Sequence, residues 1–251
     1  LHSDNSDDSH NALSAKHMSA YQKYIYTVFL QEFAQKHSLN PLDLEKISIH
    51  ITSQIPQKSG LGSSAAYACA VLQVLLEYFS ITVTQKQLYE LVFSCEVFVH
   101  KNPSGIDPCA VVYKGLHRFQ KNLELQTFQK TALKLPKKYT FLLINSGSAT
   151  ETTGEMVGNV AQLRKTDPKI TQVIKKIGRV SAAIESQLKQ GIFDGSLLSE
   201  NQILLEKLGV VGAQAREMIT EITKLGVGAK ITGAGGIQTG SGWIVVYNND
   251  L

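Results

Sequence analysis

The sequence predicts a mixed α/β fold of the α+β type, arranged in two lobes. Clustered or alternating apolar residues predict strands at 47–52, 138–145 and 243–247. A glycine-rich turn at 59–64 joins the first of these strands to a predicted helix, and helical patterns fill most of the second half of the chain. Because the second half both opens and closes on a strand, two lobes are favoured, and we find no internal repeat.

In the first half, residues 1–12 are polar and acidic and are predicted to be disordered. Apolar residues then recur at helical spacing over 14–36, which predicts an amphipathic helix. A buried helix is predicted over 65–79, because its surface is apolar nearly all round. A further helix over 84–99 begins at a threonine cap, and residues 109–113 are predicted to form a short strand.

The second half is predicted to be mainly helical before its closing strand. We expect helices over 152–165, 169–190, 196–207 and 213–225. The division between the lobes is placed so that residues 1–135 form the N-terminal lobe and residues 136–251 the C-terminal lobe.

Composition and charge exclude several classes of protein. The chain has 251 residues, 43% of them hydrophobic and 18% charged, with a net charge of +4 that is scattered rather than clustered. Nucleic-acid binding is therefore not expected, and no apolar run is long enough to cross a membrane. The three cysteines have no metal-ligand spacing and are interpreted as reduced, buried thiols of a cytoplasmic protein.

The turn at 59–64 has the features of a phosphate-binding loop. Gly60 and Gly62 allow close approach of the backbone to an anion, and the following helix offers free N–H groups and the positive end of its dipole. Ser63 and Ser64 add hydroxyls for a phosphate oxygen or a magnesium ion. The alternative is an ordinary tight turn that caps a helix.

Two carboxylates follow at a spacing of eleven residues. Glu96 lies near the end of a predicted helix and Asp107 after a Pro-Ser-Gly turn, so both side chains could point into one cleft. Phosphoryl transfer to a hydroxyl needs one carboxylate for magnesium and another at the acceptor hydroxyl. On spacing alone, however, a solvated helix residue and a turn residue are also possible.

These strings resemble signatures of the GHMP kinase family. The loop GLGSSAA resembles the family's phosphate loop, and HKNPSGID at 100–107 is similar to the HGNPSGVD stretch of its mevalonate kinase branch. The segment from Gly228 to Gly236 resembles the third signature, KLTGAGGGG, a turn that braces the phosphate loop. After Gly236 the match breaks, which leaves either a different turn or absent residues.

The resemblance implies a two-lobed fold, with an N-terminal lobe like ribosomal protein S5 and a ferredoxin-like C-terminal lobe. It implies ATP and Mg²⁺ as cofactors, Asp107 as the catalytic base, and Ser64 and Glu96 as magnesium ligands. The residues that it implicates in binding ATP are Gly60, Leu61, Gly62, Ser63, Ser64, Ala65, Gly233, Ala234 and Gly235. The residues that it implicates in binding substrate are His100, Ser104, Gly105 and Thr153.

Four points in this assignment stay open. His100 could bind substrate or simply pack beside the turn, and Thr153 could face substrate or cap a helix. Lys101 replaces a glycine of the usual pattern, which bears on substrate specificity. The family's first signature, a strand lysine and a Gly-Glu-His turn, is not among these residues. We therefore expect that a piece of the natural protein lies upstream, the alternative being a member that has lost activity.

The function expected from the resemblance is ATP-dependent phosphorylation of the primary hydroxyl of mevalonate, in isoprenoid precursor synthesis. The partner is then a small-molecule substrate, with no nucleic acid and no membrane, and a homodimer is implied. The alternatives are a sibling kinase for phosphomevalonate, homoserine or a sugar, the related diphosphomevalonate decarboxylase, and a non-catalytic member.

Overall fold

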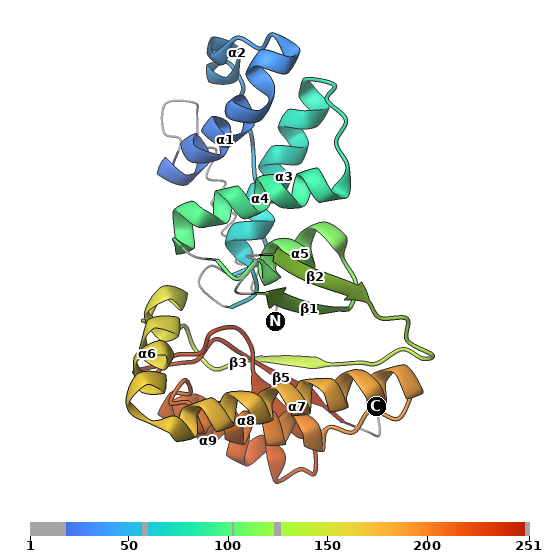
Figure 1. The fold of residues 1–251 in the computed structure, drawn as a ribbon, viewed down its shortest axis with the longest axis vertical. Coiled ribbons are helices and arrows are strands. Elements are labelled where there is room, and N and C mark those ends of the chain that lie inside the picture. Colours follow the sequence, from blue (N-terminus) through green and yellow to red (C-terminus); the bar gives the residue numbers. More distant parts are fainter. Residues whose placement is uncertain (1–18, 57–59, 102, 123–126, 249–251) are drawn as a thin grey trace, which may run out of the picture.

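The computed structural model describes residues 19–56, 60–101, 103–122 and 127–248 (Figure 1). The predictions for residues 1–12 and for residues 14–18 of the helix predicted at 14–36 lie outside these ranges. The helices are α1 (Ala20–His37), α2 (Pro41–Glu45), α3 (Ser63–Tyr78), α4 (Gln85–His100), α5 (Ile106–Tyr113), α6 (Thr153–Thr166), α7 (Pro168–Gln190), α8 (Ser196–Lys207) and α9 (Ala213–Thr223). The strands are β1 (His117–Asn122), β2 (Thr127–Ala132), β3 (Leu142–Asn145), β4 (Gly228–Ile231) and β5 (Trp243–Tyr247).

The first half is a helical cluster around one apolar core. Helices α1, α3, α4 and α5 contribute side chains such as Phe29, Leu72 and Val92, each of which is fully buried. The predicted helices at 65–79 and 84–99 are confirmed by α3 and α4. Thr84 caps α4 through a capping box, in which its hydroxyl accepts from Gln87 N and the Gln87 side chain returns to the Thr84 backbone. The cap fixes where α4 begins.

The predicted strand at 109–113 is wrong, because these residues form the end of α5. Gly105 turns the chain just before the helix, and Asp107 and Pro108 occupy its first turn. An acidic residue suits the positive end of the helix dipole, and a proline is tolerated there because first-turn N–H groups have no helical partner. The apolar run alone could not distinguish a buried strand from a buried helix.

The predicted strand at 47–52 is also not formed. Its burial does alternate as expected, with Ile47, Ile49 and Ile51 half-buried and the residues between them exposed. No neighbouring segment within the described ranges pairs with it, so the ladder of hydrogen bonds that defines a strand is missing. The alternating pattern therefore predicted which side chains are half-buried, but it did not predict whether the segment pairs with another strand.

A hairpin that the sequence did not predict follows α5. Strands β1 and β2 pair antiparallel, from His117 opposite Ala132 to Asn122 opposite Thr127. Both strands are rich in polar residues, HRFQKN and TFQKTA, so they lack the apolar alternation on which strand prediction depends.

The second half is a three-stranded antiparallel sheet with strand order β3-β5-β4. Figure 1 shows α7, α8 and α9 below this sheet and the helical cluster of the first half above it. The four predicted helices correspond to α6–α9, and β5 has the predicted bounds. Strand β3 is shorter than the predicted 138–145, and β4 was missed because it begins in a glycine-rich segment.

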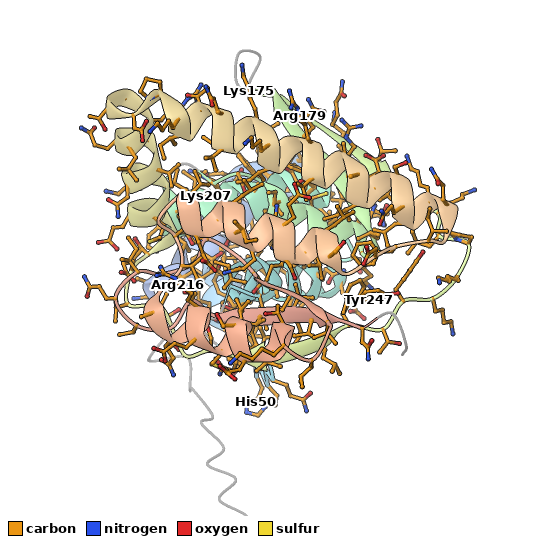
Figure 2. All side chains as sticks on the ribbon, turned by 90° about the horizontal axis from the view of Figure 1, so that it is seen from below. His50, Lys175, Arg179, Lys207, Arg216 and Tyr247 are labelled. Atoms are coloured by element: carbon orange, nitrogen blue, oxygen red, sulfur yellow. The ribbon has the colours of Figure 1, made fainter. Side chains whose placement is uncertain are left out.

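Helix α7 is long and amphipathic. In Figure 2, Lys175 and Arg179 project from α7 away from the body of the molecule, while Val180 of the same helix is buried. The described part of the chain contains no helix that is both long and apolar enough to cross a membrane. Cys69, Cys95 and Cys109 are buried and free, as predicted.

Candidate active site

The phosphate loop leads directly into α3. Gly62 precedes the helix with φ of +67°, a left-handed backbone conformation that residues other than glycine rarely adopt. Ser63 and Ser64 then occupy the first turn, and Ala65 behind them is fully buried. The N–H groups of the first turn of α3, a 16-residue helix, therefore lie at this loop. Such a loop followed by a helix N-terminus is an arrangement that binds anions.

The two glycine-rich segments lie against each other, although they are far apart in the sequence. A β-carbon on Gly233 would lie 3.0 Å from the α-carbon of Gly60, so position 233 has room for a larger residue only if its neighbour moves, whereas a β-carbon on Gly60 would lie 3.5 Å from the α-carbon of Gly233, an ordinary contact. The segment after Gly233 is held in turn by Glu151, whose carboxylate accepts hydrogen bonds from the backbone of Ile237 (3.1 Å) and Gln238 (2.9 Å). The departure from the family pattern after Gly236 is thus a turn bound to the loop that precedes α6.

Glu96 is buried and held at both carboxylate oxygens. Its side chain is 1% exposed, with the hydroxyl of Tyr21 3.2 Å from Oε1 and Nε2 of His100 3.3 Å from Oε2. The hydrogen bond to Glu96 raises the pKa of His100 above its usual value, while partial burial opposes the rise. His100 therefore contacts a carboxylate rather than only packing beside the turn.

Asp107 lies beside the phosphate loop, in the first turn of α5. A β-carbon on Gly62 would lie 3.5 Å from its Oδ1 atom. Burial raises the pKa of the Asp107 carboxyl, the negative charge of Glu96 raises it further, and His100 lowers it. The structure thus brings the phosphate loop, both carboxylates and His100 into one group.

The other predicted substrate residues are less closely connected to this group. Ser104 accepts a hydrogen bond from Ile106 N at 3.2 Å, within its own turn, and Gly105 precedes α5. Thr153 is exposed as the first residue of α6, whereas the cap of that helix is Thr152. Neither Ser104 nor Thr153 contacts the carboxylates in the described structure.

Two residues at the site were missed by the sequence analysis. Tyr21 was counted only as one of the apolar positions that define the first helix, yet its hydroxyl meets Glu96. Glu151 was given no role, yet it holds the loop after Gly236. No local signal distinguishes either residue, because each contact joins segments at least 75 positions apart.

The donor groups fit a magnesium ion that is bound jointly with phosphate. Among the described residues, no cluster of three or more His, Cys, Asp and Glu side chains could form a metal cage. Magnesium does not need one, since it usually takes one or two carboxylates together with phosphate oxygens and water. The buried carboxylate of Glu96, which already raises the pKa of Asp107, provides negative charge that such a cation would neutralise.

Comparison with known proteins connects this geometry to a family. Residues 23–115 match the family model for the GHMP kinases N terminal domain. A mevalonate kinase of Archaeoglobus fulgidus is 30% identical over 223 residues, which cover 86% of this chain and 70% of that protein. The chain belongs to the GHMP kinase family. A mevalonate kinase of Thermococcus gammatolerans is 32% identical over 199 residues, and there the match spans 76% of this chain and 57% of the relative.

Solved structures show the same fold. L. major mevalonate kinase in complex with R-mevalonate has a TM-score of 0.72 and 18% identity, with 91% of this chain and 68% of that chain covered. Streptococcus pneumoniae phosphomevalonate kinase, in complex with phosphomevalonate and AMPPNP, has a TM-score of 0.66 and 17% identity, over 93% of this chain and 76% of that one. The GHMP kinase fold expected from the sequence is therefore confirmed.

Proposed function

We propose that this chain transfers the γ-phosphoryl group of ATP to the primary hydroxyl of mevalonate. The observation that carries the proposal is the placement of Asp107 against Gly62, because it sets a carboxylate beside an anion-binding helix end. The similarity to the archaeal mevalonate kinases favours mevalonate among the possible acceptors.

In this proposal the phosphate loop binds the nucleotide. Residues Gly60–Ala65 would receive the phosphates at the start of α3, with Gly233, Ala234 and Gly235 behind them. Ser64 and Glu96 would hold magnesium, which when bound neutralises the charge of the phosphates. The loop thereby fixes the donor end of the reaction.

Asp107 acts at the acceptor end. It would take the proton of the acceptor hydroxyl or orient that hydroxyl, and its raised pKa makes it a stronger base than an ordinary aspartate. His100, Ser104, Gly105 and Thr153 are proposed to contact the acceptor. Because phosphoryl transfer needs little covalent chemistry from the protein, positioning and charge stabilisation would supply most of the catalysis.

The test is ADP release with magnesium–ATP and five acceptors: mevalonate, phosphomevalonate, diphosphomevalonate, homoserine and galactose. Release with mevalonate alone supports the proposal. Release with phosphomevalonate alone would identify a sibling kinase, in line with the similar fold of Streptococcus pneumoniae phosphomevalonate kinase. Carbon dioxide release with diphosphomevalonate would identify the decarboxylase reaction. ATP binding without turnover on any acceptor would favour a non-catalytic role.

The homodimer is a separate proposal that rests on the family resemblance. Light scattering of the purified chain would test it, and a monomer mass at working concentration would contradict it.

A further inference from the structure

The hydroxyl of Tyr21 lies between the two proposed magnesium ligands. Its oxygen is 3.3 Å from the carbonyl oxygen of Ser64 and 3.2 Å from Oε1 of Glu96. These residues come from three helices, with Tyr21 on α1 lying 43 positions before Ser64 and 75 before Glu96. One side chain therefore joins the start of α3 to the carboxylate on α4.

We propose that Tyr21 is a positioning residue that holds the Glu96 carboxylate in place relative to Ser64 for binding of magnesium–ATP. The inference rests on the proposed function and adds to it a residue that was assigned to neither the nucleotide site nor the acceptor site. Tyr21 acts through Glu96, so its loss should be felt where magnesium is bound with the nucleotide.

The hydrogen-bonding capacity of the three groups supports this role. A carbonyl oxygen and an ionised carboxylate can only accept, so the single phenolic proton is shared between Ser64 and Glu96. His100 meets the other oxygen of Glu96, and together the two contacts restrict rotation of the carboxylate.

Packing alone does not account for a tyrosine at this position. The ring of Tyr21 stacks on Tyr67 and Phe98, with centroids 5.9 and 5.8 Å apart, and phenylalanine would keep both contacts. What phenylalanine lacks is the donor toward a carboxylate that is 1% exposed. Removing one partner of a buried charged group leaves that group poorly satisfied. The substitution Tyr21→Phe therefore separates positioning from packing.

The experiment measures nucleotide binding by calorimetry, with AMP-PNP as the probe in excess magnesium and again in EDTA. We expect Tyr21→Phe to weaken binding of magnesium–AMP-PNP by roughly five- to tenfold and to leave metal-free binding unchanged. The matched control is Tyr24→Phe, since Tyr24 stacks on the same Phe98 ring at 4.7 Å and should change neither value. Equal binding by wild type and Tyr21→Phe, or equal loss with and without magnesium, would overturn the proposal.

A second arm tests whether Tyr21 acts through Glu96. In a Glu96→Gln background, Tyr21→Phe should cause little further loss of magnesium–AMP-PNP binding, because coupled residues are not additive. An undiminished loss in that background would refute the route through Glu96. Neither arm uses an acceptor alcohol, so failure to phosphorylate mevalonate would count against the proposed function and not against the role of Tyr21.

A rescue keeps the test valid if Tyr21→Phe folds poorly. Position 21 would carry 4-aminophenylalanine, which retains a donor on the same ring, or 4-methylphenylalanine, which has similar size and no donor. We expect wild-type magnesium–AMP-PNP binding with the amino group and weakened binding with the methyl group. Indistinguishable binding by these two variants would contradict the proposal.

Discussion

The backbone of Gly62 faces the carboxyl group of Asp107 so closely that a β-carbon at position 62 would lie 3.5 Å from Oδ1. Gly62 immediately precedes α3 and Asp107 lies in the first turn of α5, so this relationship joins the phosphate loop to a carboxylate of the site. It also separates two effects of a side chain at position 62, because 3.5 Å is ordinary van der Waals contact whereas φ of +67° is strained for any residue except glycine.

Gly62→Ala should therefore destabilise the protein mainly through its backbone. We expect a loss of about 1 to 2 kcal/mol, which corresponds to roughly 2–8 °C in melting temperature, together with weaker binding of ATP. The control is Gly178→Ala within α7, where a β-carbon meets nothing within 4 Å and alanine should stabilise by about 0.5–1 kcal/mol. Thermal melting and nucleotide titration check both variants, and an unchanged Gly62→Ala would contradict the geometry.

Asp107→Asn should abolish turnover and preserve nucleotide binding. The amide keeps the size of the side chain but cannot accept the hydroxyl proton, so kcat should fall by about two to four orders of magnitude. Asp43→Asn on α2, where the carboxylate contacts only Lys46 in the described structure, is the matched control and should behave as wild type. Single-turnover kinetics with ATP would measure turnover, and titration with AMP-PNP would measure nucleotide binding. Retained turnover would show that Asp107 is not the base.

The contacts that the sequence predicted at this site are those marked by local motifs. The loop around Gly62 and the turn before Asp107 each carry a distinctive string, and the structure places them together. The contacts of Tyr21 could not be predicted, because its helical spacing reports only which face is buried and not what its hydroxyl meets across 75 positions. Tertiary contacts between segments without motifs require coordinates.

The secondary structure was likewise predicted where the local sequence pattern is strong and missed where tertiary pairing decides. Helices α6–α9 were predicted within a few residues because their periodicity is long, and α6 and α7 also begin at capping residues, Thr152 and Asp167. The failures were among the short elements: α5 was taken for a strand, and the polar hairpin β1–β2 was not predicted. In segments of four to eight residues, strand and helix patterns overlap, so tertiary pairing decides.

Lys101→Gly should stabilise the protein. Lys101 follows α4 with φ of +55° and ψ of −47°, a conformation that costs a side chain about 1–2 kcal/mol, and it stands where the family pattern has glycine. Glycine relieves this strain but loses about 0.5–1 kcal/mol through its more flexible unfolded chain, so a net gain of up to about 1 kcal/mol is expected. Lys36→Gly inside α1 should instead destabilise. Urea unfolding of both variants would test this, and a loss of stability in Lys101→Gly would show that the side chain contributes more than its strain.

Lys230 should make stability depend on pH in the alkaline range. Its amine donates to the carbonyl of Ile231 at 2.6 Å, and desolvation lowers its pKa from 10.5 to about 8, although part of the residue still reaches solvent. Between these pKa values the unfolded chain binds a proton that the folded chain has released. Stability contributed by this group therefore rises with pH from about 8 to about 10.5 and is constant below that window.

The matching experiment compares wild type with Lys230→Met by urea unfolding at several pH values across this window. The alkaline groups with raised pKa, such as Cys95, act with the opposite sign in both proteins, so the difference between the two isolates Lys230. One group changes the free energy of unfolding by at most about 1.4 kcal/mol per pH unit. The free energy of unfolding of wild type should therefore rise relative to that of Lys230→Met by about 1–3 kcal/mol across the window. Lys224→Met, at an exposed lysine paired with Glu221, should show no such trend. A constant difference between wild type and Lys230→Met would mean that the amine titrates at its ordinary pKa, and that the surroundings of this β4 side chain are too open to remove it from water.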